Sequence, residues 1–217
     1  VTGRGPILVI NPNSNAAVTA GLDAALEGLR FEGGPAIDCE TLAEGPYGIE
    51  SQRDADAVVP HLVRRVAERP DAAAVVIACY SDPGLHACRE ATRAPVFGIQ
   101  EAGVTTALAR GDRFGVIAVA EASIPRHLRA LQRMGVLERL AGERAAGLTV
   151  AESAESPDAL DRLRAAGEKL RGDGADVVIL GCAGMARWRG ALERALGLPV
   201  VDPTQAAVAM ALGAVRG

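Results

Sequence analysis

The chain has 217 residues, enough for one globular unit or for two half-sized lobes that share an interface. Hydrophobic residues make up 49% of it and aromatic residues only 3%, a composition typical of helices packed closely on parallel sheets. The formal net charge of -4 and the lack of a long run of Lys or Arg argue against nucleic acid and anionic membranes as partners. Because no apolar stretch approaches the roughly 20 residues of a membrane span, we expect a soluble, cytoplasmic protein that binds a small, nearly neutral ligand.

Short β-branched runs alternate with longer segments rich in Ala, Leu, Arg and Glu along the chain. This alternation is typical of repeated strand–helix units and predicts an α/β fold with mostly parallel sheets flanked by helices. In chain order, the pattern predicts strands at 7–11, 36–41, 74–79, 96–97, 113–119, 147–150, 177–181 and 200–201. It predicts helices at 14–29, 52–68, 83–91, 102–110, 124–134, 157–171, 183–196 and 204–215.

One stretch of sequence occurs twice. Residues 71–79 form an apolar run that ends in Cys79 and is followed by a helix and an Ala-Pro-Val-Phe segment; residues 174–182 end in Cys182 and are followed by a helix and Leu-Pro-Val-Val. Nearly the same number of residues separates the cysteine from the proline in both copies. We therefore predict two similar lobes, each with a cysteine at the carboxyl end of a central strand. Such strand ends face the ligand crevice of α/β sheets, so the cysteines should face each other if the lobes do.

Cys79 and Cys182 both precede predicted helices. Unpaired N–H groups and the helix dipole favour a thiolate at that place, so we expect the pKa of each thiol to fall from about 8.5 toward neutrality. A thiolate on one face of a carbon and a thiol on the other can remove and return a proton, which inverts a stereocentre without a cofactor. Backbone N–H groups in the turns after the two cysteines are candidate donors to the enolate oxygen that forms.

Core packing is the alternative interpretation of these cysteines. Cysteine is among the most often buried residues, and one thiol at a strand end usually packs in the core. Two thiols at equivalent positions of a repeat favour catalysis instead. Cys39, inside a predicted strand, and Cys88, inside a predicted helix, are expected to pack. The even number of four cysteines predicts no disulfide framework in a chain with this much core and no export signal.

Other polar residues carry weaker signals. His61, His86 and His127 lie on separate predicted helices without ligand spacing, so we expect surface or satisfied histidines and no metal. Residues 11–15, an Asn-rich turn, stand where a nucleotide-binding loop would have its glycines, which argues against a nucleotide cofactor; they cap a helix or contact a ligand. A solvated helix start is expected for three residues near strand ends that could alter the pocket, namely Gln100, Glu101 and Glu121.

Blocks spread over almost the whole chain carry a family resemblance. They are Ile10-Asn11-Pro12-Asn13-Ser14, Gly45-Pro46-Tyr47-Gly48-Ile49-Glu50, Ala78-Cys79-Tyr80-Ser81-Asp82-Pro83-Gly84-Leu85, Gly181-Cys182-Ala183-Gly184-Met185 and Leu198-Pro199-Val200-Val201-Asp202. In this order they resemble the blocks of hydantoin racemases, in the aspartate/glutamate racemase superfamily. The resemblance implies two α/β lobes related by a pseudo-twofold axis with the site between them, a cofactor-independent two-base mechanism and, commonly, a homo-oligomer.

The resemblance also implies roles for single residues. It makes Cys79 and Cys182 the catalytic pair. It places Asn13, Tyr80, Ser81, Ala183 and Gly184 in turns that line the substrate, with Ile49 and Ser123 as further pocket candidates. We take residues 1–98 as lobe 1, with helix 204–217 packing back on it, and residues 99–203 as lobe 2.

The turns after the cysteines bear on the substrate. Amino-acid racemases of this superfamily typically follow the first cysteine with Asn-Thr and the second with Thr and a polar residue, which hold the carboxylate and ammonium groups. Here Tyr80-Ser81 and Ala183-Gly184 take those places, and leaving buried charges unpaired costs several kcal/mol. A neutral cyclic amide fits better, so we predict racemisation of a 5-substituted hydantoin. Allantoin racemase, amino-acid racemase, a decarboxylase, a maleate isomerase-like enzyme and a non-catalytic small-ligand binding module remain alternatives.

Overall fold

The computed structural model describes residues 5–216; residues 1–4 and 217, at the outer ends of the predicted lobe 1 and C-terminal helix, lie outside the described residues. The strands are β1 (Ile7–Asn11), β2 (Ile37–Thr41), β3 (Ala74–Ile77), β4 (Val96–Gly98), β5 (Phe114–Ala118), β6 (Leu140–Ala145), β7 (Val177–Gly181) and β8 (Val200–Val201). They form two parallel sheets with the orders β2-β1-β3-β4 and β6-β5-β7-β8. The matching orders confirm the predicted α/β fold of two similar lobes, which we call lobe 1 and lobe 2.

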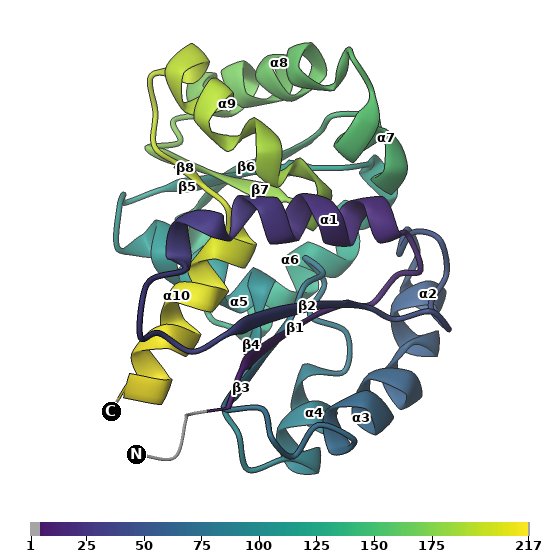
Figure 1. The fold of residues 1–217 in the computed structure, drawn as a ribbon. Helices are drawn as coiled ribbons and strands as arrows, with labels where there is room; N and C mark the ends of the chain where they lie inside the picture. The colour runs from purple at the N-terminus through teal and green to yellow at the C-terminus, as the bar shows by residue number, and fades with distance from the viewer. Residues whose placement is uncertain (1–4, 217) are drawn as a thin grey trace.

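Helices cover both sheets (Figure 1). They are α1 (Ala16–Ala25), α2 (Gln52–Ala57), α3 (Val59–Ala67), α4 (Leu85–Ala91), α5 (Ile99–Leu108), α6 (Ile124–Arg133), α7 (Val150–Glu155), α8 (Ala159–Gly172), α9 (Arg189–Leu196) and α10 (Pro203–Arg216), with short 3-10 turns η1 (Glu27–Leu29), η2 (Glu121–Ser123), η3 (Leu137–Arg139) and η4 (Ala183–Trp188). Within residues 5–216, none of them combines the length and the apolarity needed to cross a bilayer.

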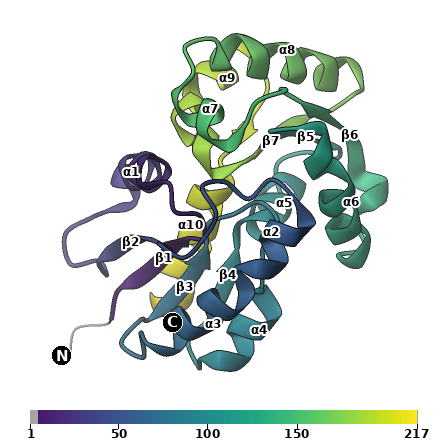
Figure 2. The same ribbon diagram turned by 90° about the vertical axis from the view of Figure 1, so that its right-hand side faces the viewer.

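The central strand of lobe 1 is buried on both faces, which is why its sequence is a continuous apolar run. Ile7 and Val9 of β1 lie in a core that extends through lobe 2, whereas Leu8 and Ile10 pack with Leu62 of α3 in a second core. Helices α5 and α10 pack against each other between the lobes, where α5 contacts β7 and α10 contacts β3 (Figure 2). This shared core fixes the position of the carboxyl end of β3 relative to that of β7.

Two predicted elements are wrong. No strand forms at 147–150; the strand of this region lies earlier, as β6, at the edge of its sheet. Charged residues interrupt the apolar pattern of β6, so the sequence did not indicate a strand there. An edge strand tolerates such residues because one of its sides is not paired with another strand. The β-branched residues that suggested a strand begin α7 instead, where Thr149 and Glu152 form a reciprocal capping box. The single helix predicted at 52–68 is divided at Val58 into α2 and α3, with a proline in the first turn of α3.

Candidate active site

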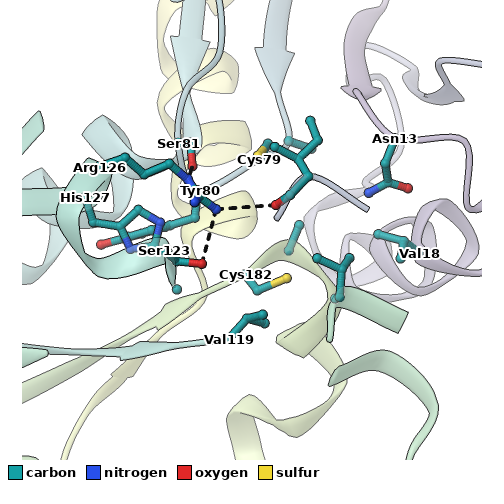
Figure 3. A pocket seen from close by; sticks show the side chains of 16 residues that line it. Asn13, Val18, Cys79, Tyr80, Ser81, Val119, Ser123, Arg126, His127 and Cys182 are labelled. Atoms are coloured by element: carbon teal, nitrogen blue, oxygen red, sulfur yellow. Dashed lines mark hydrogen bonds between the residues drawn. The ribbon is translucent and has the colours of Figure 1, made fainter. Parts of the chain in front are cut away.

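The carboxyl ends of β3 and β7 face a pocket between the lobes that is open to solvent. Cys182 directly follows β7, and Cys79 lies two residues after β3. Figure 3 shows the two side chains on either side of the pocket, Cys79 from lobe 1 and Cys182 from lobe 2. The structure therefore brings together the two thiols that the repeat singled out.

Every other residue assigned to the site from the sequence also lines this pocket. These are Asn13, Ile49, Tyr80, Ser81, Ser123, Ala183 and Gly184. Sequence reasoning missed further lining residues, namely Val18, Ala78, Val119, Arg126, His127, Val150 and Gly181. The aliphatic ones make much of the wall apolar, and Arg126 adds a charge that was not predicted there.

The pKa predicted for the thiols is wrong. Burial raises the pKa of Cys79 to about 12, although the Ser81 backbone N–H and the Arg126 charge act in the opposite direction. Burial likewise raises the pKa of Cys182, against the Gly184 backbone N–H and Arg126. Helix α4 begins only at Leu85, so Cys79 does not lie at its N-terminus as predicted. Among the N–H groups assigned to an enolate oxygen, those of Ser81 and Gly184 lower the pKa of the two thiols instead.

Arg126 is the most informative of the missed residues. It lies on α6 in lobe 2, is only 8% exposed, and makes no ion pair within residues 5–216. Its Nη1 donates to the carbonyl oxygens of Glu50 and Ala122 at 3.1 and 3.2 Å, and its Nη2 donates to that of Ile49 at 3.4 Å. Its Nε and Nη2 also donate to the hydroxyl oxygens of Ser81 and Ser123, which line the pocket. A guanidinium group surrounded by neutral oxygens therefore joins the two lobes beside both thiols.

The histidine predictions hold for His86 and His127 but not for His61, whose buried Nδ1 has no hydrogen-bond partner within the described residues. His127 is buried but satisfied: its Nδ1 lies 2.5 Å from a Glu143 carboxylate oxygen, and its ring packs edge-on against Tyr80 with centroids 5.0 Å apart. His86 is exposed and His61 half-buried, and neither lines the pocket between the cysteines. His127 thus fixes the wall of the pocket without a free ring nitrogen at Nδ1 for acid–base chemistry.

The remaining cysteines pack as predicted. Cys88 is fully buried in the core of lobe 1, and Cys39 is half-buried against the shared core. Both are free thiols outside the pocket, as are Cys79 and Cys182 within it. Burial raises the pKa of Cys39 to about 12 and that of Cys88 to about 11.

Asp82 connects the Cys79 turn to helix α5. Its two carboxylate oxygens accept the backbone N–H groups of Gln100 and Glu101, each at 2.9 Å, and so cap that helix. Its own N–H donates to the Cys79 carbonyl oxygen at 2.9 Å. Burial raises the pKa of Asp82 to about 7 despite these bonds.

This cap corrects the prediction of solvated helix starts. Gln100 is only 1% exposed, because its helix begins inside the interface between the lobes, and its solvated placement is wrong. Glu101 is half-buried and pairs with Arg89 at 3.2 Å. Glu121 is exposed, as predicted.

Comparison with known proteins confirms the resemblance seen in the sequence. The family model described as Asp/Glu/Hydantoin racemase matches residues 7–211. Hydantoin racemases of Paenarthrobacter aurescens and Pseudomonas sp. (strain NS671) are 38% and 36% identical over 214 residues, which cover 94% of this chain and 89% and 84% of theirs. The structure of allantoin racemase from Klebsiella pneumoniae is similar with a TM-score of 0.92 at 29% identity, covering 98% of this chain and 88% of that one. The chain therefore belongs to the Asp/Glu/Hydantoin racemase family and is an isomerase.

Proposed function

We propose that the protein interconverts the enantiomers of a 5-substituted hydantoin, with Cys79 and Cys182 as the two bases. The observation that carries the proposal is the position of these thiols, one from each lobe, on either side of one pocket. A thiolate removes the proton from C5 of the ring, and the thiol on the opposite face delivers its own proton to C5. The roles reverse for the other enantiomer, so no cofactor is needed.

The raised pKa values suit a weak carbon acid. Burial makes each thiolate a stronger base toward C5, at the cost of a smaller thiolate population near neutral pH. Arg126 offsets part of that cost, because its positive charge lowers the pKa of both Cys79 and Cys182. The Arg126 charge stabilises the thiolate of either Cys79 or Cys182. This suits a reaction in which the negative charge starts on one sulfur and ends on the other.

The polar part of the wall favours an uncharged ring over an amino acid. Asn13, Ser81 and Ser123 are neutral, and Arg126 donates its N–H groups to oxygens of the protein itself. A substrate carboxylate would find no uncommitted charged donor there, and its burial would be unfavourable. A hydantoin offers only amide N–H and C=O groups. The aliphatic residues of the wall, Val18, Ile49, Val119 and Val150, can accommodate an apolar 5-substituent.

Allantoin, a hydantoin with a ureido group at C5, is the second candidate. The likeness to the allantoin racemase of Klebsiella pneumoniae favours it, whereas the aliphatic part of the wall favours an apolar substituent. Arylmalonate decarboxylase also shares the fold, at 23% identity and a TM-score of 0.66, which shows the fold alone.

A substrate panel tests the proposal. Each enantiomer of several 5-alkyl and 5-aryl hydantoins, and of allantoin, is incubated with the protein in D₂O. Exchange at C5 is followed by NMR and inversion by polarimetry. We expect exchange and inversion for at least one hydantoin, and loss of racemisation in Cys79→Ser and Cys182→Ser. Unchanged racemisation in either variant contradicts the two-base assignment, and an inert wild type contradicts the substrate class. Binding without exchange would instead indicate a binding module.

The cytoplasmic location and the homo-oligomeric state stay predictions. Cell fractionation checks the first, and light scattering coupled to size-exclusion chromatography checks the second.

A further inference from the structure

Two serine hydroxyls, one from each lobe, face the pocket with their hydrogens unused. Ser81 Oγ accepts from Arg126 Nε at 2.8 Å, and Ser123 Oγ accepts from Arg126 Nη2 at 3.1 Å. A guanidinium group only donates, so neither hydroxyl hydrogen can point at it. Throughout the described part of the chain, these hydroxyls make no other hydrogen bond. Ser123 even stands at the N-cap of α6 without using its side chain as a cap.

We propose that Ser81 and Ser123 donate these hydrogens to the substrate oxygen that becomes negative, and that Arg126 is the positioning residue that orients them. The inference rests on the proposed function. When a thiolate takes the C5 proton, the electron pair of the C5–H bond moves onto the neighbouring C4 carbonyl oxygen and forms an enolate. When the opposite thiol delivers its proton, the pair returns to form the new C5–H bond and that sulfur becomes the thiolate.

The charge distribution supports this arrangement. Arg126 is buried without a carboxylate partner, so its positive charge stabilises the negative charge that develops transiently on the enolate oxygen, although its own N–H groups are already committed. It lowers the pKa of both pocket thiols, which places its charge near both ends of the path that the negative charge follows. Oriented donors and a fixed charge that already surround this path need no reorganisation during the reaction.

Only some of the donors near the pocket have a hydrogen available for the enolate oxygen. The N–H groups of Arg126 are taken by the two serines and by three backbone carbonyl oxygens, so the guanidinium cannot itself contact the enolate. The backbone N–H groups of Ser81 and Gly184 favour the thiolates. The hydroxyls of Ser81 and Ser123 are therefore the donors left for oxygen.

The test compares Ser81→Ala, Ser123→Ala and Arg126→Lys with the wild type. Racemisation gives kcat and KM, and C5 exchange in D₂O is measured separately for each enantiomer. The matched control is Arg129→Lys: Arg129 lies on the same helix and also donates across the lobes, to Gln52 Oε1 at 2.8 Å, but is exposed and away from the serines. Thermal unfolding of every variant reports on folding.

We expect each serine variant to lower kcat about 10²-fold, the usual effect of losing one oxyanion donor, with KM changed less than about threefold. Exchange should slow equally for both enantiomers, because both pass through the same enolate. Arg126→Lys should lower kcat similarly, and adding Ser81→Ala to it should lower kcat by less than about threefold more. Arg129→Lys should keep the wild-type kcat.

Three results would overturn the inference. The first is a wild-type kcat in either serine variant. The second is slower exchange of one enantiomer only in Ser81→Ala, since this would mean that Ser81 acts on Cys79 rather than on the shared enolate. The third is independent, multiplying effects of Arg126→Lys and Ser81→Ala. If Arg126→Lys fails to fold, the two serine variants decide alone. An inert wild type overturns the proposed function and this inference together, whereas an active wild type with unaffected serine variants overturns the inference alone.

Discussion

The substitution Gly98→Ala tests how the Cys79 turn is held in place. Gly98 precedes helix α5, and a Cβ atom there would lie 2.3 Å from Asp82 Cγ and 2.4 and 2.6 Å from its carboxylate oxygens. These distances are far below van der Waals contact, and the carboxylate is held by two backbone N–H groups. Either Asp82 leaves its place or the backbone around Gly98 shifts.

The expected loss of stability comes from two sources, a weakened hydrogen bond to Asp82 and the steric cost of the added Cβ atom. A hydrogen bond to a charged group contributes about 1.5–3 kcal/mol, and forcing an atom into a packed site costs about 1–3 kcal/mol. We therefore expect the free energy of unfolding to fall by about 2–4 kcal/mol. Because the Asp82 N–H donates to the Cys79 carbonyl oxygen at 2.9 Å, the thiol should move as well. Racemisation should fall about tenfold or more.

Urea unfolding followed by circular dichroism measures the loss. The control is Gly21→Ala in α1, where a Cβ meets nothing within 4 Å and helix propensity favours Ala by about 1 kcal/mol. Lobe 2 suggests a compensating double substitution. There, Asp202 stands at the position equivalent to Gly98, and its Oδ1 caps α10 by accepting two backbone N–H groups at 2.8 and 2.9 Å. Gly98→Asp combined with Asp82→Gly should restore most of the stability. A loss below about 0.5 kcal/mol in Gly98→Ala would refute the steric argument.

Three further outcomes are expected. Arg126→Met should raise the pKa of both pocket thiols further, so their alkylation by iodoacetamide at pH 8, followed by peptide mass spectrometry, should slow; an unchanged rate contradicts the charge effect. The raised pKa of Asp82, about 7 against 3.8, means that its contribution to stability is complete below about pH 4 and lost as the pH rises through 7. Urea midpoints at pH 5 and pH 8 should therefore differ less in Asp82→Asn than in the wild type. Glu143→Ala should leave His127 Nδ1 buried without its partner and lower the free energy of unfolding by about 1–3 kcal/mol, measured in urea.

The fold was predictable because the buried parallel strands are continuous apolar runs. β1, β5 and β7 are buried along their whole length, and each is evident in the sequence as such a run. The repeat then indicated that two of the strand ends are equivalent. The edge strand β6 was missed because charged residues interrupt its apolar pattern. Arg144 is exposed at the edge and pairs with Asp173, whereas the Glu143 carboxylate is buried and pairs with His127.

Arg126 could not be found in the same way, since its burial depends on groups distant in the sequence. Its partners Ser81, Ile49 and Glu50 are 45 to 77 positions away, and they meet it only once the lobes are packed together. On α6 it looks like Arg129, which is exposed. A local signal did exist: Arg126 lies one helical turn after Ser123, on the same face, and Ser123 was already a pocket candidate.

The pseudo-symmetry supplies two thiols, but their surroundings differ, and thermodynamics limits where this difference can appear. Ser153 Oγ lies 3.7 Å from Cys182 Sγ, and Asp82 is tied to the chain at Cys79, so the two thiols are not equivalent bases. Two enantiomers have equal free energy in an achiral solvent, which requires kcat/KM to be the same in both directions whatever the protein does. The asymmetry of the lobes can therefore appear only as different kcat values matched by proportionally different KM values. Equal kcat values for the two enantiomers would mean that Arg126, which both thiols share, outweighs everything that distinguishes them.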